Sequence, residues 1–172
     1  MILTSWDLII IKGAPGSGKT EVSKSLEKLL PKGVRIEVDT VRNMVSSVDW
    51  KNQKEHIKLL EISAKLAAEF LTTDFSPIIV VDTFSGDKVK KFIEDLKLLK
   101  SDIKIKIIGL YVDDTTLAKR LQDRPKGLFK NLEISKKINQ NTINLKQSDE
   151  IQLDTSNSKP DVIALKIYNL LN

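Results

Sequence analysis

The stretch Gly13-Ala14-Pro15-Gly16-Ser17-Gly18-Lys19-Thr20 decides the fold of this chain. It has the form G-x-x-x-x-G-K-T and lies between an apolar, β-branched run at 6–12 and a segment at 19–30 with apolar residues at helical spacing. Glycines let the backbone curl around phosphate oxygens without Cβ clashes, so that several N–H groups point at the anion. A chance glycine-rich turn is the alternative, but it would not require this strand and helix on either side.

The last two residues of the stretch give it a more specific chemistry. Lys19 can reach the β- and γ-phosphates of a nucleoside triphosphate, and the Thr20 hydroxyl can ligate Mg²⁺. The positive end of the following helix adds to the attraction for phosphate. The sequence therefore predicts a site for ATP and Mg²⁺ in which every residue from Gly13 to Thr20 takes part.

Outward from this loop, strands and helices alternate along the whole chain. Further strands are predicted at 34–38, 78–82, 103–112 and 150–153, and helices at 52–72, 86–99, 114–123, 133–146 and 160–171, with a short helix or turn at 40–47. Strands joined by crossover helices run parallel. We therefore expect one domain over 1–172 with a three-layer α/β/α P-loop NTPase fold, a five-stranded parallel sheet and a helical lid at about 114–147.

The composition is that of an ordinary globular domain and excludes several classes of protein. The chain contains no cysteine, which excludes disulfides and thiolate metal sites. No apolar run approaches the roughly 20 residues of a membrane span, and residues 1–6 lack the pattern of a secretory signal. We therefore expect a cytoplasmic protein without a membrane partner. The net charge of +5 suits an anionic partner, although a lysine-rich solvated surface explains it as well.

The phosphate loop is shared by kinases, GTPases and ATPases, so other segments must distinguish them. The sequence lacks the Asn-Lys-x-Asp signature of a GTPase, and its third strand is followed by Thr83-Phe84-Ser85 rather than by an Asp-x-x-Gly switch. A large oligomeric ATPase would need a longer chain. The small-molecule kinases remain.

Four blocks of the sequence resemble the small P-loop kinases related to adenylate, gluconate and shikimate kinases. They are the loop at 13–20, Asp39-Thr40-Val41-Arg42, the strand that ends at Asp82, and Arg120-Leu121-Gln122-Asp123-Arg124. Within that fold the chain is most similar to the group of zeta toxins, polynucleotide kinases and chloramphenicol phosphotransferase. Only the loop is specific by itself, and the order and spacing of the other blocks add the rest. The resemblance covers essentially the whole chain and implies a phosphotransferase with an alcohol group as acceptor.

The resemblance implies roles for Asp39, Arg42 and Asp82. In the polynucleotide-kinase-like group, an Asp at the place of Asp39 accepts the proton of the acceptor hydroxyl, and an Arg three residues later binds an anionic group of the acceptor. Asp82 has the Walker B form, whose carboxylate holds Mg²⁺ directly or through water. The structural alternatives are a helix N-cap for Asp39, a surface ion pair for Arg42 and a turn cap for Asp82.

Two arginines belong to the predicted lid. Arg120 and Arg124 are four residues apart, which places them on one face of a helix. In adenylate-kinase-like enzymes one such arginine lies near the adenine or α-phosphate and the other offsets charge on the transferring phosphoryl group. Which of the two has which role stays open, and two solvated surface arginines are the alternative. Thr155, in the turn after the last strand, corresponds to a residue that borders the adenine pocket in similar kinases, or is simply part of a turn.

Three further residues receive structural interpretations. Arg35 lies inside a predicted strand, and His56, the only histidine, is interpreted as a surface or satisfied residue with no catalytic context. Trp50 is interpreted as a packing residue, with a weaker hypothesis that it lines the acceptor pocket.

The sequence thus predicts transfer of the γ-phosphoryl group of ATP to a hydroxyl of a small molecule or of a polynucleotide 5′ end. The acceptor stays open among a polynucleotide, an anionic metabolite, a nucleoside, a sugar and an antibiotic. Aromatic residues make up only 5% of the chain, which gives little support to an aromatic groove for single strands. The alternative function is a regulatory ATP-binding or ATPase protein without an acceptor, which would have no use for Asp39 and Arg42.

Overall fold

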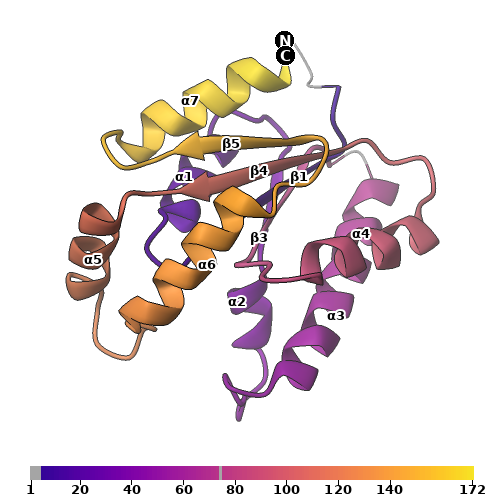
Figure 1. Ribbon diagram of the computed structural model, residues 1–172. Coiled ribbons are helices and arrows are strands. Elements are labelled where there is room, and N and C mark those ends of the chain that lie inside the picture. Colours follow the sequence, from indigo (N-terminus) through magenta and orange to yellow (C-terminus); the bar gives the residue numbers. More distant parts are fainter. Residues whose placement is uncertain (1–4, 74) are drawn as a thin grey trace.

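A central strand organises the sheet, as the alternating pattern of elements predicts. The computed structural model describes residues 5–73 and 75–172. Strand β1 (Leu8–Gly13) lies between β3 (Ile78–Val81) and β4 (Ile105–Tyr111), and the edges are β2 (Val34–Glu37) and β5 (Glu150–Asp154). All four pairings are parallel and give the order β2-β3-β1-β4-β5 (Figure 1). The predicted five-stranded parallel sheet and three-layer fold are confirmed.

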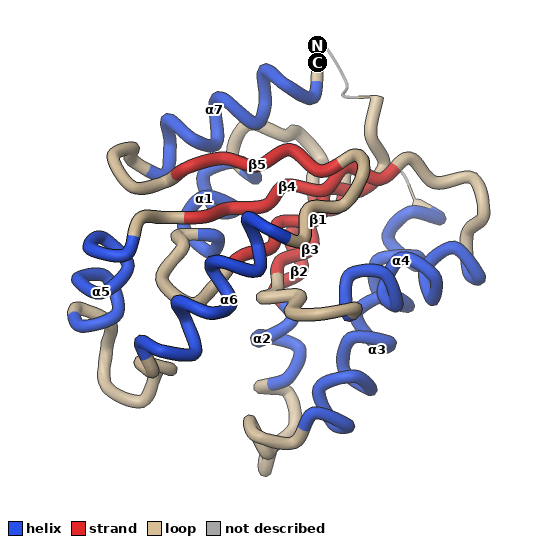
Figure 2. The backbone as a smooth tube through the Cα atoms, viewed as in Figure 1, coloured by secondary structure: helices blue, strands red, loops and turns tan. Residues whose placement is uncertain are grey.

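Helices cover both faces of this sheet (Figure 2). In chain order they are α1 (Lys19–Glu27), α2 (Val38–Arg42), α3 (Gln53–Thr72), α4 (Lys88–Leu99), α5 (Asp114–Gln122), α6 (Leu132–Asn144) and α7 (Pro160–Leu171). One boundary matters for the site. The second strand was predicted to reach residue 38, but it ends at Glu37, and Val38 already begins α2. Asp39 therefore lies in the first turn of a helix rather than at the end of a strand.

The alternation of side chains along β1 divides the core into two clusters. Ile9 and Ile11 pack with buried residues of α1 and α7, while Leu8 and Ile10 pack with buried residues of α3 and α4. All four side chains are fully buried, as expected for a strand covered on both faces. The central strand is thereby fixed from both sides, and so is the loop that follows it.

Helix α6 meets the sheet through polar contacts instead. Lys12 of β1 and Glu150 of β5 form an ion pair of 2.8 Å in which both side chains are almost completely buried. Asn139 of α6 accepts a hydrogen bond from the Val112 amide and donates one to the Val112 carbonyl. Because buried polar groups must be paired, the ion pair links β1 to β5, and the Asn139 contacts fix α6 beside the end of β4.

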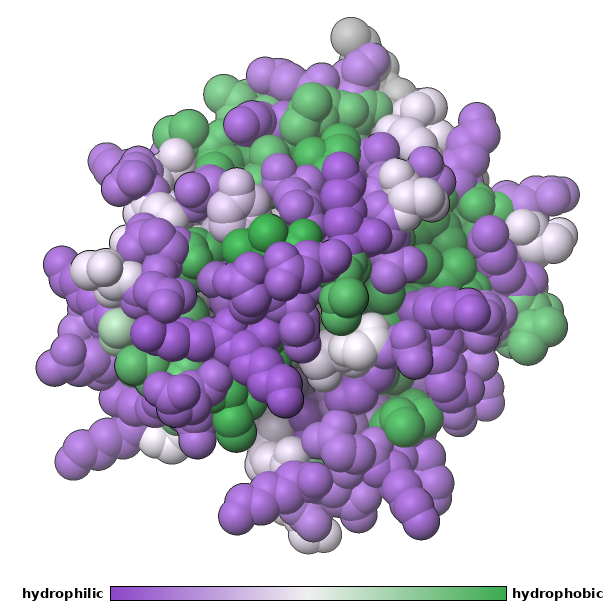
Figure 3. Space-filling model, in the orientation of Figure 1, coloured by the Kyte–Doolittle hydropathy of each residue, from purple (hydrophilic) through white to green (hydrophobic). Residues whose placement is uncertain are grey.

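The molecular surface is largely hydrophilic on the face that Figure 3 shows, with smaller apolar patches between charged side chains. Within residues 5–73 and 75–172, no helix is long and apolar enough to cross a membrane. The carboxyl ends of the parallel strands β1, β2 and β3 meet at one edge of the sheet. In open α/β folds this edge is where ligands bind.

Candidate active site

The phosphate loop connects β1 to α1 in the curled form that its sequence predicts. Gly16 and Gly18 have φ angles of +89° and +88°, a backbone region that L side chains rarely adopt. Gly18 is also the N-cap of α1, so the amide groups of the first turn are directed into the loop. Lys19 Nζ donates a hydrogen bond to the Ala14 carbonyl over 3.2 Å. The loop, its lysine and the helix N-terminus together form a cradle for phosphate groups.

Two carboxylates face the Lys19 amine. Burial lowers the pKa of Lys19, and the negative charges of Asp82 and Asp39 partly offset this effect. Arg124 also lowers the pKa of Lys19, so a cation from the lid is near the same point. The structure therefore brings Lys19, Asp39, Asp82 and Arg124 together, although they come from four separate parts of the sequence.

The Thr20 hydroxyl has a partner that the sequence did not suggest. It donates to Glu37 Oε1 over 2.7 Å, and Glu37 also accepts a hydrogen bond from Arg35 over 2.9 Å. Arg35 additionally pairs with Glu27, which agrees with its structural interpretation. The contact between Thr20 and Glu37 spans 17 residues, so no local motif could have indicated it.

The oxygen ligands available here fit a magnesium ion bound mainly through phosphate and water. The described residues contain no group of three or more His, Cys, Asp or Glu side chains that could hold a metal by itself. Mg²⁺ in nucleotide sites commonly takes one or two protein ligands, the remainder being phosphate oxygens and waters. The Thr20 hydroxyl and the Asp82 carboxylate are of the right chemical type, with Glu37 next to Thr20.

Asp82 is buried at the end of β3 and is held by two partners. His56 Nε2 lies 3.3 Å from Asp82 Oδ2, and the Phe84 amide donates to the same oxygen over 3.1 Å. Burial alone would raise the pKa of Asp82, but its close contact with His56, the charge of His56 and the Phe84 amide lower it overall. Phe84 itself has a φ of +48°, an uncommon conformation for a bulky residue.

His56 is therefore more closely linked to the site than its sequence context indicated. The interpretation as a satisfied residue without catalytic context missed the pairing with Asp82. His56 belongs to α3 and is buried, and its second ring nitrogen, Nδ1, lies 3.2 Å from Lys88 Nζ at the start of α4. A lone histidine on a helix carries no signal of such partners, because both lie more than two dozen residues further along the chain.

Asp39 lies in the first turn of α2 but does not cap it. The N-cap of α2 is Glu37, so the structural alternative of an N-cap role for Asp39 is wrong. Partial burial and the charge of Asp82 raise the pKa of Asp39, while Lys19 and Arg42 act in the opposite direction. Its side chain is still 60% exposed, so the carboxylate is available to a ligand that approaches the phosphate loop.

Arg42 is buried rather than placed on the surface. Its guanidinium lies 4.2 Å from the centre of the Trp50 ring and donates to the Trp50 carbonyl over 3.3 Å. Its contact with Asp39 is long, at 3.8 Å, and its Nε atom has no hydrogen-bond partner within the described residues. The alternative of a simple surface ion pair is therefore wrong for Arg42. Trp50 packs on Arg42 while remaining 46% exposed.

The two lid arginines occupy different places. Arg120, in the last turn of α5, donates to Thr155 Oγ1 over 2.9 Å, to the Thr155 carbonyl over 2.6 Å and to the Gly16 carbonyl over 3.4 Å. Arg124 lies beyond the end of α5 and donates to the Phe129 carbonyl. Burial lowers the pKa of Arg124 and the charge of Asp39 raises it. The expectation that both arginines share one helical face is therefore wrong: Arg120 is beside the loop and Thr155, and Arg124 approaches Asp39.

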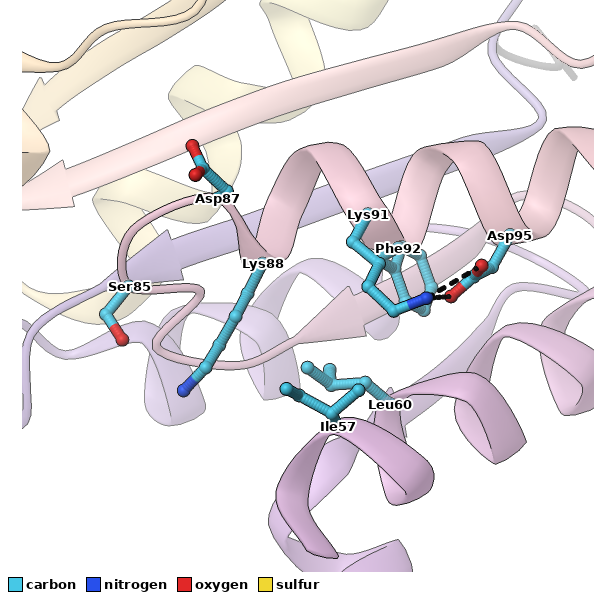
Figure 4. Close-up of a pocket in the computed structure, with 8 residues that line it drawn as sticks. All are labelled: Ile57, Leu60, Ser85, Asp87, Lys88, Lys91, Phe92 and Asp95. Atoms are coloured by element: carbon cyan, nitrogen blue, oxygen red, sulfur yellow. Dashed lines mark hydrogen bonds and ion pairs between the residues drawn. The ribbon is translucent and has the colours of Figure 1, made fainter. Parts of the chain in front are cut away.

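Two hollows border this arrangement. One, of about 250 Å³, lies beside Gly18 and is lined by Arg120, Thr155 and residues of α1 and α7. The Thr155 hydroxyl donates to the Ser17 carbonyl over 2.8 Å, which fixes one wall against the phosphate loop. The other, also about 250 Å³, lies between α3 and α4, where Ile57 and Leu60 face Phe92 and Lys88 (Figure 4).

Comparisons with known proteins agree with this architecture. The family model described as AAA domain, AAA_18, matches residues 9–139. A nucleotide-binding protein of Coprothermobacter proteolyticus is 29% identical over 114 residues, which are 66% of this chain and 34% of that relative, so the match spans about a third of it.

Solved structures share the fold at low sequence identity. The tunicamycin resistance protein of Deinococcus radiodurans has a TM-score of 0.74 and 17% identity, with 97% of this chain and 96% of that chain covered. The APS kinase of Mycobacterium tuberculosis, solved in complex with AMPPNP and APS, has a TM-score of 0.66 and 13% identity, with 99% of each chain covered. The chain therefore has a nucleotide-binding P-loop kinase fold, as its sequence predicts.

Proposed function

The chain belongs to the AAA_18 family of AAA domains, and we propose that it is an ATP-dependent kinase that transfers the γ-phosphoryl group to a hydroxyl. One observation carries the proposal: the Asp39 carboxylate is 60% exposed and interacts electrostatically with Lys19 of the phosphate loop and with Arg124 of the lid. A protein that only binds a nucleotide needs the loop but not a carboxylate opposite it.

On the donor side, the loop amides and Lys19 bind the β- and γ-phosphates. The hollow between Gly18, Arg120 and Thr155 is the proposed adenosine pocket, since it lies at the start of α1 and is open beside the loop. Arg120 fixes this side through its bonds to Thr155 and Gly16. Arg124 is the proposed cation at the transferring phosphoryl group, because its charge lowers the pKa of Lys19 and its own pKa is raised by Asp39.

The metal site of the proposed reaction is built from Thr20 and Asp82. These two residues would hold Mg²⁺, which would supply positive charge to the phosphate groups. His56 and the Phe84 amide hold the Asp82 carboxylate in one orientation. The low pKa of Asp82 keeps its carboxylate charged, which is the form that a metal or its bound water requires.

On the acceptor side, Asp39 is the proposed proton acceptor and Arg42 the acceptor-binding residue. The exposed carboxylate of Asp39 can take a hydrogen bond from a hydroxyl placed opposite the γ-phosphate. Arg42 has an unpartnered Nε atom and only a long contact with Asp39, so its guanidinium has donors for an anionic group. When the lid loop closes, Arg124 excludes water and thereby limits hydrolysis of ATP.

The first test is a coupled ADP-release assay with pools of nucleosides, sugars, sugar acids and 5′-hydroxyl oligonucleotides. A kinase shows ADP release above the hydrolysis background with at least one pool. ATP binding without any acceptor-dependent turnover would instead support a regulatory ATP-binding protein.

Asp39→Asn separates the two sides of the proposed site. It removes the proton acceptor but keeps nearly the same shape, so transfer falls by about 10²-fold or more while the affinity for ATP stays within roughly twofold. Calorimetry with AMPPNP measures the affinity and the coupled assay measures the transfer. An equal loss of both would assign Asp39 to nucleotide binding or to structure.

A further inference from the structure

We infer that Lys88 is a second acceptor-binding residue, and that Lys88 and Arg42 together select hydroxyl compounds that carry a phosphate or carboxylate group. The inference rests on the proposed function and adds to it a residue and a substrate class. It concerns the side of the site formed by α2, α3 and the start of α4, which the phosphate loop does not reach.

Lys88 is a half-buried cation without a carboxylate among its direct partners. Its amine donates to Gln53 Oε1 over 2.7 Å and lies 3.2 Å from His56 Nδ1. No ion pair links it to a carboxylate anywhere in residues 5–73 and 75–172. Burial lowers the pKa of Lys88, the charge of Asp82 raises it, and Arg42 lowers it further. Lys88 and Arg42 are therefore two cations close enough to repel one another.

Another lysine of α4, Lys91, does have carboxylate partners. Lys91 lies one turn further along the helix and borders the same hollow (Figure 4). Its amine lies 3.2 Å from Asp95 and 3.3 Å from Glu61. Lys91 thus has two carboxylate partners, whereas Lys88, at the start of the same helix, has none within the described residues.

The charges near Lys88 leave room for one further anion. Asp82 is paired with His56, and Asp39 is shared between Lys19 and Arg42 at longer range. Arg42 has a buried Nε atom without a hydrogen-bond partner, and Lys88 an amine that can donate a third bond. A phosphate or carboxylate between them would satisfy both donors and relieve their mutual repulsion, since charge-assisted hydrogen bonds are the stronger class.

Gln53 and His56 act as positioning residues for this amine. Both belong to the first turn of α3, which is capped by the Asn52 side chain. The hydrogen bond from Lys88 to Gln53 and its 3.2 Å contact with His56 join the start of α4 to the start of α3, beside the Asp82 carboxylate. A long lysine side chain loses much freedom when it is held in this way, and a neutral site would gain little from ordering it.

The decisive experiment measures binding of inorganic phosphate to the full chain saturated with AMPPNP and Mg²⁺. AMPPNP occupies the phosphate loop, so any phosphate that binds must use another site. We expect the wild type to bind phosphate, Lys88→Gln to bind it about tenfold more weakly, and Lys88→Arg to retain most of the affinity. Lys91→Gln is the matched control, because its amine already has two carboxylate partners, and it should leave phosphate binding unchanged.

Several outcomes would overturn the inference. They are no phosphate binding by the AMPPNP-bound wild type, an equal loss in Lys91→Gln, and unchanged binding in Lys88→Gln. A thermal unfolding curve for each variant excludes a loss caused by misfolding, and the Lys88→Arg variant keeps the test valid if Lys88→Gln does not fold.

Matched acceptor pairs separate this inference from the proposed function. Sugar acids are compared with the parent sugars, and nucleoside 3′-phosphates with nucleosides, in the ADP-release assay. We expect kcat/KM to favour the anionic member, and Lys88→Gln to reduce that preference about tenfold mainly through KM. Turnover with neutral acceptors that Lys88→Gln does not affect would reject the inference and keep the kinase. ATP binding without turnover on any acceptor would reject the kinase itself, whatever the phosphate titration shows.

Discussion

The donor and acceptor halves of this site are built in opposite ways. The donor half is one continuous stretch, in which the backbone from Gly13 to Thr20 supplies the phosphate contacts and Arg120 and Thr155 close one side through bonds to loop carbonyls. The acceptor half has no such stretch. It consists of side chains from α2, α3, the end of β3 and the start of α4, each held by another side chain.

This difference explains how each half can vary. Backbone donors bind any phosphate in the same way, so the donor half tolerates few changes and recognises one common ligand. Side chains on separate elements can be replaced singly, so the acceptor half can change its ligand without disturbing the fold. The positions that determine the acceptor are therefore expected among Asp39, Arg42, Trp50 and Lys88 rather than in the loop.

The largest effect should come from removing the one side chain on which the donor half depends. Lys19→Met removes the cation that contacts the transferring phosphate, and transfer should fall by about 10²–10³-fold, whichever acceptor is used. Lys24→Met is the matched control, because Lys24 lies on the same helix, is exposed and, among the described residues, pairs with Glu21 alone. Steady-state rates with two unrelated acceptors provide the measurement. A loss confined to one acceptor would mean that Lys19 belongs to the acceptor half.

A smaller effect is expected for the two lid arginines: replacing Arg120 should mainly weaken nucleotide binding, and replacing Arg124 should mainly lower kcat. Arg120 is bonded to Thr155 and Gly16, so Arg120→Gln should weaken AMPPNP binding about tenfold. Within the described residues Arg124 donates to the Phe129 carbonyl alone, and the charge of Asp39 raises its pKa, so Arg124→Gln should lower kcat by roughly 10²-fold with little change in affinity.

Calorimetry and the coupled assay, run on the same preparations, separate the two quantities. If affinity and kcat change equally in Arg120→Gln and Arg124→Gln, the two lid arginines act as one unit. Their different positions would then not correspond to different functions.

The difference between the continuous donor half and the dispersed acceptor half also explains which features could be predicted from the sequence. The fold and the loop could be predicted because their signals are local: periodicity within each element and eight consecutive residues between β1 and α1. The partners of the site residues could not. Thr20 meets Glu37 across 17 residues, and His56 meets Lys88 across 32. Such contacts depend on how α3 and α4 pack on the sheet, which no single-chain pattern specifies.

The end of α5 is the boundary that the helical spacing did not predict correctly. Arg120 and Arg124 have helical spacing, but α5 ends at Gln122, so Arg124 leaves the helix and turns toward Asp39. The residue after Arg124 is Pro125, and a residue before proline is disfavoured in the helical conformation. The sequence thus contained the signal that separates the two arginines, although the spacing pattern alone did not.

The smallest expected effect is a shift in pH dependence that tests the acceptor half alone. Asp39 must be ionised to accept a proton, and its pKa is raised above the ordinary 3.8 by partial burial and by Asp82. As the pH falls through this raised pKa, the carboxylate is protonated and kcat/KM falls. The acid limb of the profile should therefore lie above pH 3.8. Arg42 lowers the pKa of Asp39, so Arg42→Gln should move the limb to higher pH.

Comparing Arg42→Gln with the wild type separates the ionisation of Asp39 from that of ATP, whose phosphates also take up protons as the pH falls. ATP is the same in both measurements, so its contribution to the two limbs cancels, and only a change in the enzyme separates them. Lys91→Gln, remote from Asp39, should leave the limb in place. A limb that does not move in Arg42→Gln would mean that Asp39 is not the group whose ionisation limits transfer. The acceptor half would then need another base, whereas the donor half would be unaffected, because its contacts to phosphate come from the backbone and from Lys19.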